Sequence, residues 1–148
     1  MRVFVTGGTG FIGANLLLLY HKHETTNCAR GVDVSAALEA FAPDVILNCA
    51  AEIYDAPAMY AANVGLVHDI LEYVKAHPRV KLIHLGSSSE YGPVSRATKE
   101  DDPISPIDMY QATKGAATLL CQGYARQFSL DVAVVRPYSV YGELERYG

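Results

Sequence analysis

The chain has 148 residues; half of them are apolar, 19% are charged, and the formal net charge is −4. These values are typical of one globular domain with a sizeable core, so residues 1–148 are expected to form a single domain. The sequence shows no block of basic residues, which argues against binding to nucleic-acid phosphates. No apolar run approaches the roughly 20 residues of a membrane span.

The distribution of cysteine and histidine argues against a metal site. Cys28, Cys49 and Cys121 are widely spaced and odd in number, which indicates reduced thiols rather than a disulfide framework or a zinc site. His21 and His23 are too close in sequence to share a helix face as ligands at i, i+4 would. The N-terminus enters a strand directly, without a signal-peptide pattern. We therefore expect a cytoplasmic protein that binds no metal.

A glycine-rich turn follows the first predicted element, an apolar strand at residues 3–5. Gly7 allows a sharp turn, Gly10 lets a pyrophosphate approach the backbone, and Gly13 lets the next helix pack close to the sheet. Phosphates would then lie at the positive end of that helix, facing unpaired N–H groups. The spacing is G-x-x-G-x-x-G, and its place between strand and helix predicts a dinucleotide-binding loop rather than an ordinary turn.

Strands and helices alternate along the rest of the chain. Further strands are predicted at 31–34, 44–49, 80–85 and 131–136, and helices at 11–22, 36–41, 58–77 and 109–128, with Ser35 as the N-cap of the helix at 36–41. Such alternation predicts an α/β fold, a Rossmann-like doubly wound parallel sheet with helices on both faces. The loops after the strands should converge at one edge of that sheet, where ligands bind.

The stretch at residues 23–31 is the weak part of this pattern. A dinucleotide-binding fold places its second strand here and ends it in an acidic residue about 20 positions after the glycines. We find no apolar run long enough for that strand, so it is either absent, much reduced, or affected by missing residues. The choice between NAD and NADP therefore has no residue on which to rest.

Three side chains suggest proton transfer. Tyr110 and Lys114 lie four apart on a predicted helix and share one face, where an ammonium favours the phenolate form of a tyrosine. Such a tyrosine can exchange a proton with a substrate hydroxyl, and Ser87, after a predicted strand, could bond the same oxygen. The isolated pair is weak support, because tyrosine and lysine at this spacing are common on solvated helices.

The motifs together, in their order, resemble the extended short-chain dehydrogenase/reductase family, the NAD-dependent epimerase/dehydratases of nucleotide sugars. The resemblance rests on residues 6–13, 48–51, 87–92, 110–114 and 136–142. It implies that Ser87, with Ser88 as the alternative, Tyr110 and Lys114 are catalytic. It also implies an NAD cofactor, with NADP not excluded, bound by Gly7, Gly10, Phe11, Ile12, Gly13, Asp33, Val34, Cys49, Ala50, Ala51, Asn63, Ser87, Tyr110, Lys114, Pro137 and Val140.

The resemblance makes a nucleotide-sugar epimerase, reductase or dehydratase the leading hypothesis, with epimerase or reductase favoured, a nucleotide sugar as the substrate and a homodimer as the expected assembly. The family's 4,6-dehydratases resemble Thr-Asp-Glu where this chain has Ser87-Ser88-Ser89, which argues against a dehydratase. The family also continues beyond the position of Gly148 with a substrate-binding part, so we expect a C-terminal substrate domain to be missing. The alternatives are a non-catalytic NAD(P)-binding or sensing module and a nucleotide-free structural domain.

Overall fold

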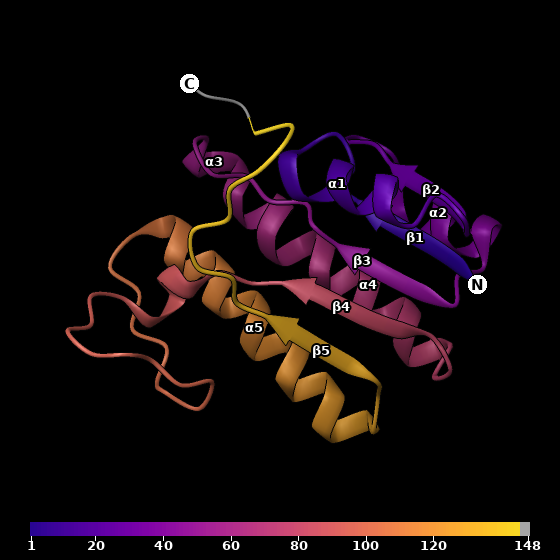
Figure 1. Cartoon of the computed structure of the whole chain (residues 1–148). Coiled ribbons are helices and arrows are strands. Elements are labelled where there is room, and N and C mark those ends of the chain that lie inside the picture. Colours follow the sequence, from indigo (N-terminus) through magenta and orange to yellow (C-terminus); the bar gives the residue numbers. More distant parts are fainter. Residues whose placement is uncertain (146–148) are drawn as a thin grey trace.

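Five parallel strands form the sheet, in the order β2-β1-β3-β4-β5 (Figure 1). The computed structural model describes residues 1–145. The strands are β1 (Arg2–Thr6), β2 (Glu24–Cys28), β3 (Val45–Asn48), β4 (Lys81–Leu85) and β5 (Val132–Val135). Every neighbouring pair is parallel, because each connection crosses back over the sheet through a helix.

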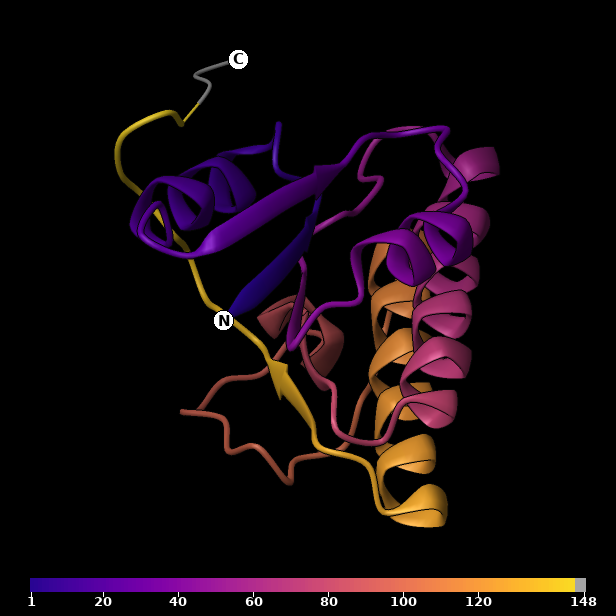
Figure 2. The ribbon, with the colours of Figure 1, turned by 90° about the vertical axis from the view of Figure 1, so that its right-hand side faces the viewer.

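Helices cover both faces of this sheet (Figure 2). α1 (Phe11–Leu19) lies on one face, and α2 (Val34–Phe41), α4 (Leu66–Ala76) and α5 (Met109–Phe128) lie on the other. The short α3 (Ala56–Met59) and the π-helical η1 (Tyr60–Gly65) run into α4, and the 3-10 helix η2 (Ser88–Tyr91) follows β4. The doubly wound Rossmann-like fold predicted from the sequence is confirmed.

The core lies on both sides of β1, whose apolar residues Val3, Phe4 and Val5 are at most 1% exposed. Alternate side chains of a strand point to opposite faces, so Phe4 packs with the larger cluster beneath α2, α4 and α5, while Val3 and Val5 pack toward α1. Burial on both faces explains why this central strand reads as a continuous apolar run.

The second strand, which no apolar run revealed at residues 23–31, is present, because Glu24–Cys28 forms β2. This strand lies at the edge of the sheet and pairs only with β1, so its side chains stay partly exposed and need not be apolar. Thr25 and Thr26 are β-branched, which suits a strand. The Asn27 side chain also accepts a hydrogen bond from the Gly8 backbone N–H at 2.8 Å, which ties β2 to the glycine turn.

Three further local predictions need correction. Residues 31–34 are not a strand: Gly31 has a φ of 85°, and the segment turns into α2. The N-cap of α2 is Asp33 rather than Ser35, because the Asp33 carboxylate accepts hydrogen bonds from the backbone N–H groups of Ser35 at 2.9 Å and Ala36 at 3.1 Å. The first helix ends at Leu19, shorter than the predicted 11–22.

We predict that Asp33→Ala lowers the free energy of unfolding by about 1 kcal/mol, because α2 loses the acceptor for its first N–H groups. Ser35→Ala is the matched control, because the Ser35 side chain does not cap the helix. Urea denaturation followed by circular dichroism measures both. Equal losses for the two variants would contradict the assignment of Asp33 as the cap.

Candidate active site

The glycine turn between β1 and α1 brings three backbone segments into close contact. Gly7 has a φ of 69°, and a Cβ on it would lie 2.6 Å from the Ala50 backbone nitrogen, just after β3. A Cβ on Gly13 would lie 2.3 Å from the Gly7 carbonyl oxygen, so α1 can start this close to the turn only with glycine there. A Cβ on Gly10 would meet the Gly7 oxygen at 3.2 Å, a tolerable contact within the turn itself.

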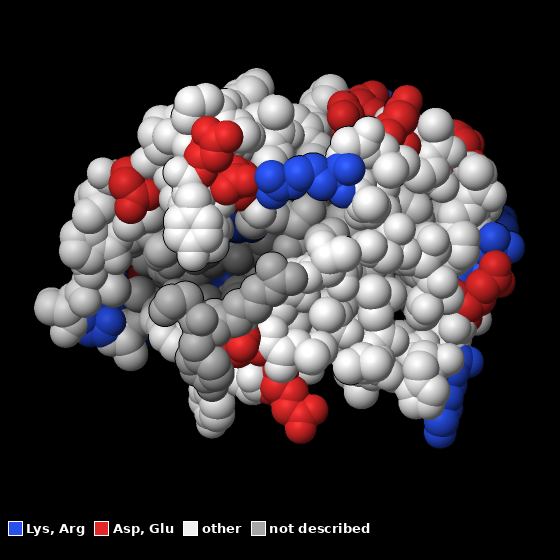
Figure 3. All heavy atoms as spheres, turned by 90° about the horizontal axis from the view of Figure 1, so that it is seen from above, with Lys and Arg blue, Asp and Glu red and all other residues white. Residues whose placement is uncertain are grey.

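A cavity of about 800 Å³ lies at the carboxyl ends of β1, β2 and β3. Figure 3, which views the molecule from above, shows this end hollowed, with acidic and basic side chains interspersed around it. Six residues predicted to contact the cofactor line the cavity: Gly7, Gly10, Phe11, Cys49, Ala50 and Ala51. A cavity at the carboxyl ends of parallel strands is where doubly wound folds bind ligands. The glycine turn and the loop after β3 thus lie at one site, as the sequence predicted.

Other predicted cofactor contacts do not line this cavity. Ile12 and Gly13 lie one and two residues further into α1 than Phe11. The Asp33 carboxylate caps α2, and the Val34 side chain is 5% exposed and packs in the core. Asn63 is 1% exposed within the π-helical η1. These four side chains and Gly13 therefore support the walls of the site, and their contact with a cofactor stays a prediction.

Asn63 holds the loop after β3 in place. Its side-chain oxygen accepts the Glu52 backbone N–H at 2.8 Å, and its amide donates to the Glu52 carbonyl at 2.9 Å and to the Thr113 hydroxyl at 3.0 Å. All of these groups are buried, so each bond satisfies a polar atom that would otherwise lose its water partner. Asn63 thus connects the loop after β3 to the helix α5 that carries Tyr110 and Lys114.

The cavity lining contains an ion pair that the sequence did not reveal. The Arg30 guanidinium, 78% exposed, lies 2.9 Å from a carboxylate oxygen of Glu52. The other carboxylate oxygen accepts three backbone N–H groups, those of Ile53, Tyr54 and Asp55. The N–H groups of Tyr54 and Asp55, followed by Arg30, lower the pKa of Glu52 to about 2. Glu52 is therefore a fixed anion that links the loop after β3 to the loop after β2.

Ser87, Tyr110 and Lys114 lie outside the lining of that cavity, near the carboxyl end of β4. Ser87 is the N-cap of η2: its hydroxyl accepts the Ser89 N–H at 3.2 Å and bonds the Ser89 hydroxyl at 2.6 Å. The Lys114 ammonium donates to the Leu85 carbonyl at 2.5 Å, two residues before Ser87. Tyr110 is half-buried one turn earlier on α5. Helix α5 and the exit of β4 thus bring Lys114 next to the Ser87 segment.

Two ionisable side chains, Lys114 and Glu90, are buried in this part of the fold. Lys114 is 2% exposed, and burial lowers its pKa, while the nearby Glu90 carboxylate opposes that shift. Glu90 is fully buried, and burial raises its pKa; one of its oxygens accepts the Ser87 backbone N–H at 2.7 Å. A buried ammonium needs a counter-charge and hydrogen bonds to remain charged. The Glu90 charge favours the ammonium without a direct ion pair, and its bond to Ser87 shapes the loop at residues 86–92, here called the serine loop.

A chain of polar side chains crosses the sheet below the cavity. The Thr6 hydroxyl donates to the Asn48 side-chain oxygen at 2.5 Å, and the Asn48 amide nitrogen lies 3.0 Å from His84 Nδ1. Burial, with Lys114 nearby, lowers the pKa of His84 to about 3, so the ring is neutral. Neutral histidine can accept the amide hydrogen at Nδ1. This chain fixes the carboxyl ends of β1, β3 and β4 relative to one another.

The segment after β5 borders the serine loop. The Pro137 carbonyl accepts the Ser88 backbone N–H at 3.1 Å, so it holds the start of η2. Pro137 is half-buried and Val140 is 42% exposed. Both residues stay predicted nicotinamide contacts, since neither lines the large cavity.

The sequence pattern of the NAD dependent epimerase/dehydratase family matches residues 3–147. The chain belongs to this family. Among its relatives, dTDP-6-deoxy-L-talose 4-dehydrogenase (NAD(P)(+)) of Kitasatospora kifunensis is 33% identical over 144 residues, covering 79% of this chain and 45% of the relative. UDP-glucose 4-epimerase of Corynebacterium glutamicum is 28% identical over 177 residues, covering 100% of this chain and 54% of the relative.

Solved structures of related enzymes are similar in fold to this epimerase/dehydratase-family chain. The UDP-glucuronic acid 4-epimerase of Bacillus cereus, crystallised with NAD, has a TM-score of 0.84 and 26% identity, covering 99% of this chain and 59% of that one. The chain thus spans about half the length of the relatives that it matches. The Corynebacterium alignment also extends over 177 residues against 148 here, so 29 of its positions (177 − 148) have no counterpart in this chain.

None of the helices within residues 1–145 combines the length and apolar content that crossing a bilayer requires. In the same residues, no cluster of histidine, cysteine, aspartate and glutamate is arranged to hold a metal ion. Cys49, in the cavity lining, has its pKa raised to about 11 by burial, so it contributes a neutral thiol to the wall.

We predict that Gly10→Val weakens NAD and NADP binding by at least about tenfold, or about 1.4 kcal/mol, while the fold survives. Gly10 lines the cavity, and a Cβ there would lie 3.2 Å from the Gly7 oxygen. Gly123→Val is the matched control, because a Cβ there meets no atom within 4 Å. Fluorescence titration of both cofactors measures the affinities; equal affinity in the two variants would remove the turn from the binding site.

Proposed function

We propose that residues 1–148 form the cofactor-binding and catalytic domain of an NAD(P)-dependent enzyme that acts on a nucleotide sugar, as an epimerase or a reductase. The observation that carries this proposal is the glycine turn that opens onto a cavity of about 800 Å³, with Lys114 buried beside the Ser87 loop. The family relatives support it, because their names describe UDP- and dTDP-sugar epimerases and dehydrogenases.

In this proposal the cofactor lies along the carboxyl ends of the strands. Gly7, Gly10 and Phe11 hold its phosphates, and Cys49 to Ala51 line its path toward the Ser87 loop. When bound, the nicotinamide supplies the hydride acceptor and donor. Each of these contacts uses backbone or small side chains, which lets the dinucleotide approach the sheet closely.

The chain's own residues would then carry out the proton transfer. Ser87 bonds the substrate hydroxyl, Tyr110 exchanges its proton, and the buried Lys114 lies one helical turn further along α5. Glu90 keeps Lys114 charged at a buried position, and the bond to the Leu85 carbonyl fixes the direction of the ammonium. Removal of the hydroxyl proton would accompany loss of a hydride from the carbon that bears the hydroxyl, which gives a keto group; a reductase would run both transfers in the opposite direction.

A second candidate function is a non-catalytic NAD(P)-binding module. The observation that favours it is that the large cavity is lined by the glycine turn but by none of Ser87, Tyr110 and Lys114. Assay of the purified chain with UDP- and dTDP-sugars and both cofactors separates the two. Cofactor binding without any turnover in the full-length protein favours the binding module.

We predict that Tyr110→Phe lowers kcat by about 10²–10⁴-fold, the usual contribution of a general acid or base. The ring still packs on α5, so folding and cofactor Kd should stay within about threefold of wild type, below the tenfold that about 1.4 kcal/mol would produce. Tyr20→Phe, at the end of α1, is the control and should leave kcat unchanged. Steady-state kinetics of the two variants measures this. A fully active Tyr110→Phe enzyme would remove Tyr110 from the mechanism.

A further prediction concerns the cofactor phosphate. Arg30 lies after β2 on the cavity lining, where doubly wound folds carry a ribose-binding acid or an arginine that accommodates the 2′-phosphate. We expect Arg30→Leu to raise the Kd for NADP by about tenfold or more and to change the Kd for NAD little, because only NADP loses a charge-assisted bond. Arg126→Leu, on exposed α5 surface, is the control. Equal changes for both cofactors would contradict a role in phosphate recognition.

A further inference from the structure

The large cavity has few charged side chains in its lining. Among the described residues, the lining contains one basic side chain, Arg30, and two acidic ones, Glu52 and Glu145. NADP differs from NAD by a phosphate on the adenosine ribose, and a phosphate monoester carries about 1.5 to 2 negative charges near pH 7. The partners of Arg30 therefore bear directly on which of the two dinucleotides the cavity accepts.

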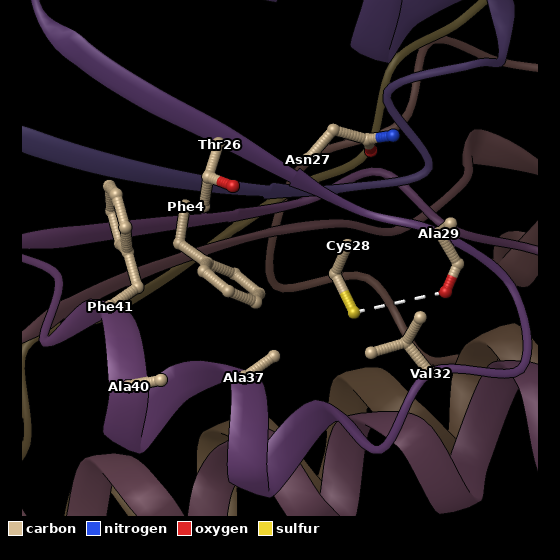
Figure 4. A pocket seen from close by; sticks show the side chains of 9 residues that line it. All are labelled: Phe4, Thr26, Asn27, Cys28, Ala29, Val32, Ala37, Ala40 and Phe41. Atoms are coloured by element: carbon tan, nitrogen blue, oxygen red, sulfur yellow. Dashed lines mark hydrogen bonds between the residues drawn. The ribbon is translucent and has the colours of Figure 1, made fainter.

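A tight turn carries Arg30 at the end of β2. The Ala29 carbonyl accepts the Val32 backbone N–H at 3.3 Å, and Gly31 has a φ of 85°, which suits the third residue of such a turn. Figure 4 shows Ala29 and Val32 beside Cys28 at an apolar hollow of about 340 Å³ between the sheet and α2. These three residues line the large cavity as well, so the segment forms a shared wall. Its backbone is held in place, whereas the long Arg30 side chain is largely exposed and can change direction.

Glu52, the partner of Arg30, is held much more firmly. One of its carboxylate oxygens accepts the backbone N–H groups of residues 53–55, at 3.0, 3.0 and 3.2 Å. The Asn63 side chain binds both the N–H and the carbonyl of Glu52. The second carboxylate oxygen lies 2.9 Å from the Arg30 guanidinium, and the Glu52 side chain is only 10% exposed. The ion pair thus joins a fixed anion to a cation that can turn away from it.

A phosphate that approaches Arg30 has to compete with the Glu52 carboxylate. A phosphate bound to the same guanidinium lies close to that carboxylate, where like charges repel. An ion pair with an exposed partner is weak enough to exchange, so the carboxylate lowers the affinity for a phosphate without abolishing it. NAD has a ribose hydroxyl in place of the phosphate, and a neutral hydroxyl meets no such repulsion.

We propose that Glu52 is a positioning residue that sets a preference of the cavity for NAD over NADP by holding the Arg30 guanidinium. The inference rests on the proposed cofactor-binding function and deepens it, because it concerns the same cavity. When the Glu52 charge is removed, the guanidinium is released to a 2′-phosphate and NADP gains affinity. The acid that favours NAD thus lies on the loop after β3, and it acts through an arginine of the loop after β2.

Isothermal titration calorimetry of NAD and NADP with the full chain tests this role. Glu52→Gln keeps an acceptor oxygen for the backbone N–H groups of residues 53–55, so the loop should stay folded, which circular dichroism checks. We expect the Kd for NADP to fall by about fivefold or more, and the Kd for NAD to stay within about twofold of wild type. Glu145→Gln is the matched control, since it removes the other carboxylate of the lining and leaves the ion pair intact. It should not change the ratio of the two Kd values.

The Arg30→Leu background tests whether Glu52 acts through Arg30. In that background, Glu52→Gln should change the Kd for NADP by less than about twofold, because the residue that it releases is gone. A gain that persists without Arg30 would show direct repulsion by Glu52 and overturn the positioning role. An unchanged Kd ratio in Glu52→Gln, or equal weakening of both cofactors, would also overturn the inference while NAD binding by wild type still supports the cavity. A wild-type chain that binds neither cofactor would overturn the proposed function and this inference together.

Discussion

The close approach of the glycine turn to the end of β3 is the contact on which the candidate site depends. Gly7 and Gly13 leave no room for a Cβ, so β1, α1 and the exit of β3 meet backbone to backbone. Side chains at these positions would push α1 away from the sheet and separate the walls of the cavity. Because the contact is made by backbone, the turn is rigid and its N–H groups have fixed directions, which suits an anionic ligand.

Hydrogen bonds and an ion pair then fix the loops around this turn. The Asn27 side chain holds the Gly8 N–H, Asn63 holds the Glu52 segment, and Arg30 joins Glu52 from the loop after β2. Each bond links segments that are distant in the sequence but adjacent at the carboxyl ends of parallel strands. The result is a cavity whose walls are bonded to one another, so that little ordering is left to occur when a ligand binds.

The part of the site near the end of β4 contains two buried ionisable side chains, Lys114 and Glu90. A single buried ammonium would be strongly destabilising, and it would lose its proton more readily. Glu90 favours the charged form of Lys114, and the Leu85 carbonyl accepts a hydrogen bond from the Lys114 ammonium where the Ser87 loop begins. The same carboxylate accepts the Ser87 N–H, so one side chain both orders the loop that carries Ser87 and favours the ammonium of Lys114 through its charge.

The sequence by itself determined the central strands, the glycine turn and the helix that carries Tyr110 and Lys114, because each depends on local spacing or on an uninterrupted apolar run. Only the tertiary structure decided that Glu24–Cys28 is a strand, since a polar edge strand is stabilised by pairing with β1 and by the bond from Gly8 to Asn27. It also decided the partners of Arg30, Glu90 and His84. Those contacts join residues far apart in the chain, and no local pattern records which distant side chain the folded sheet places beside another.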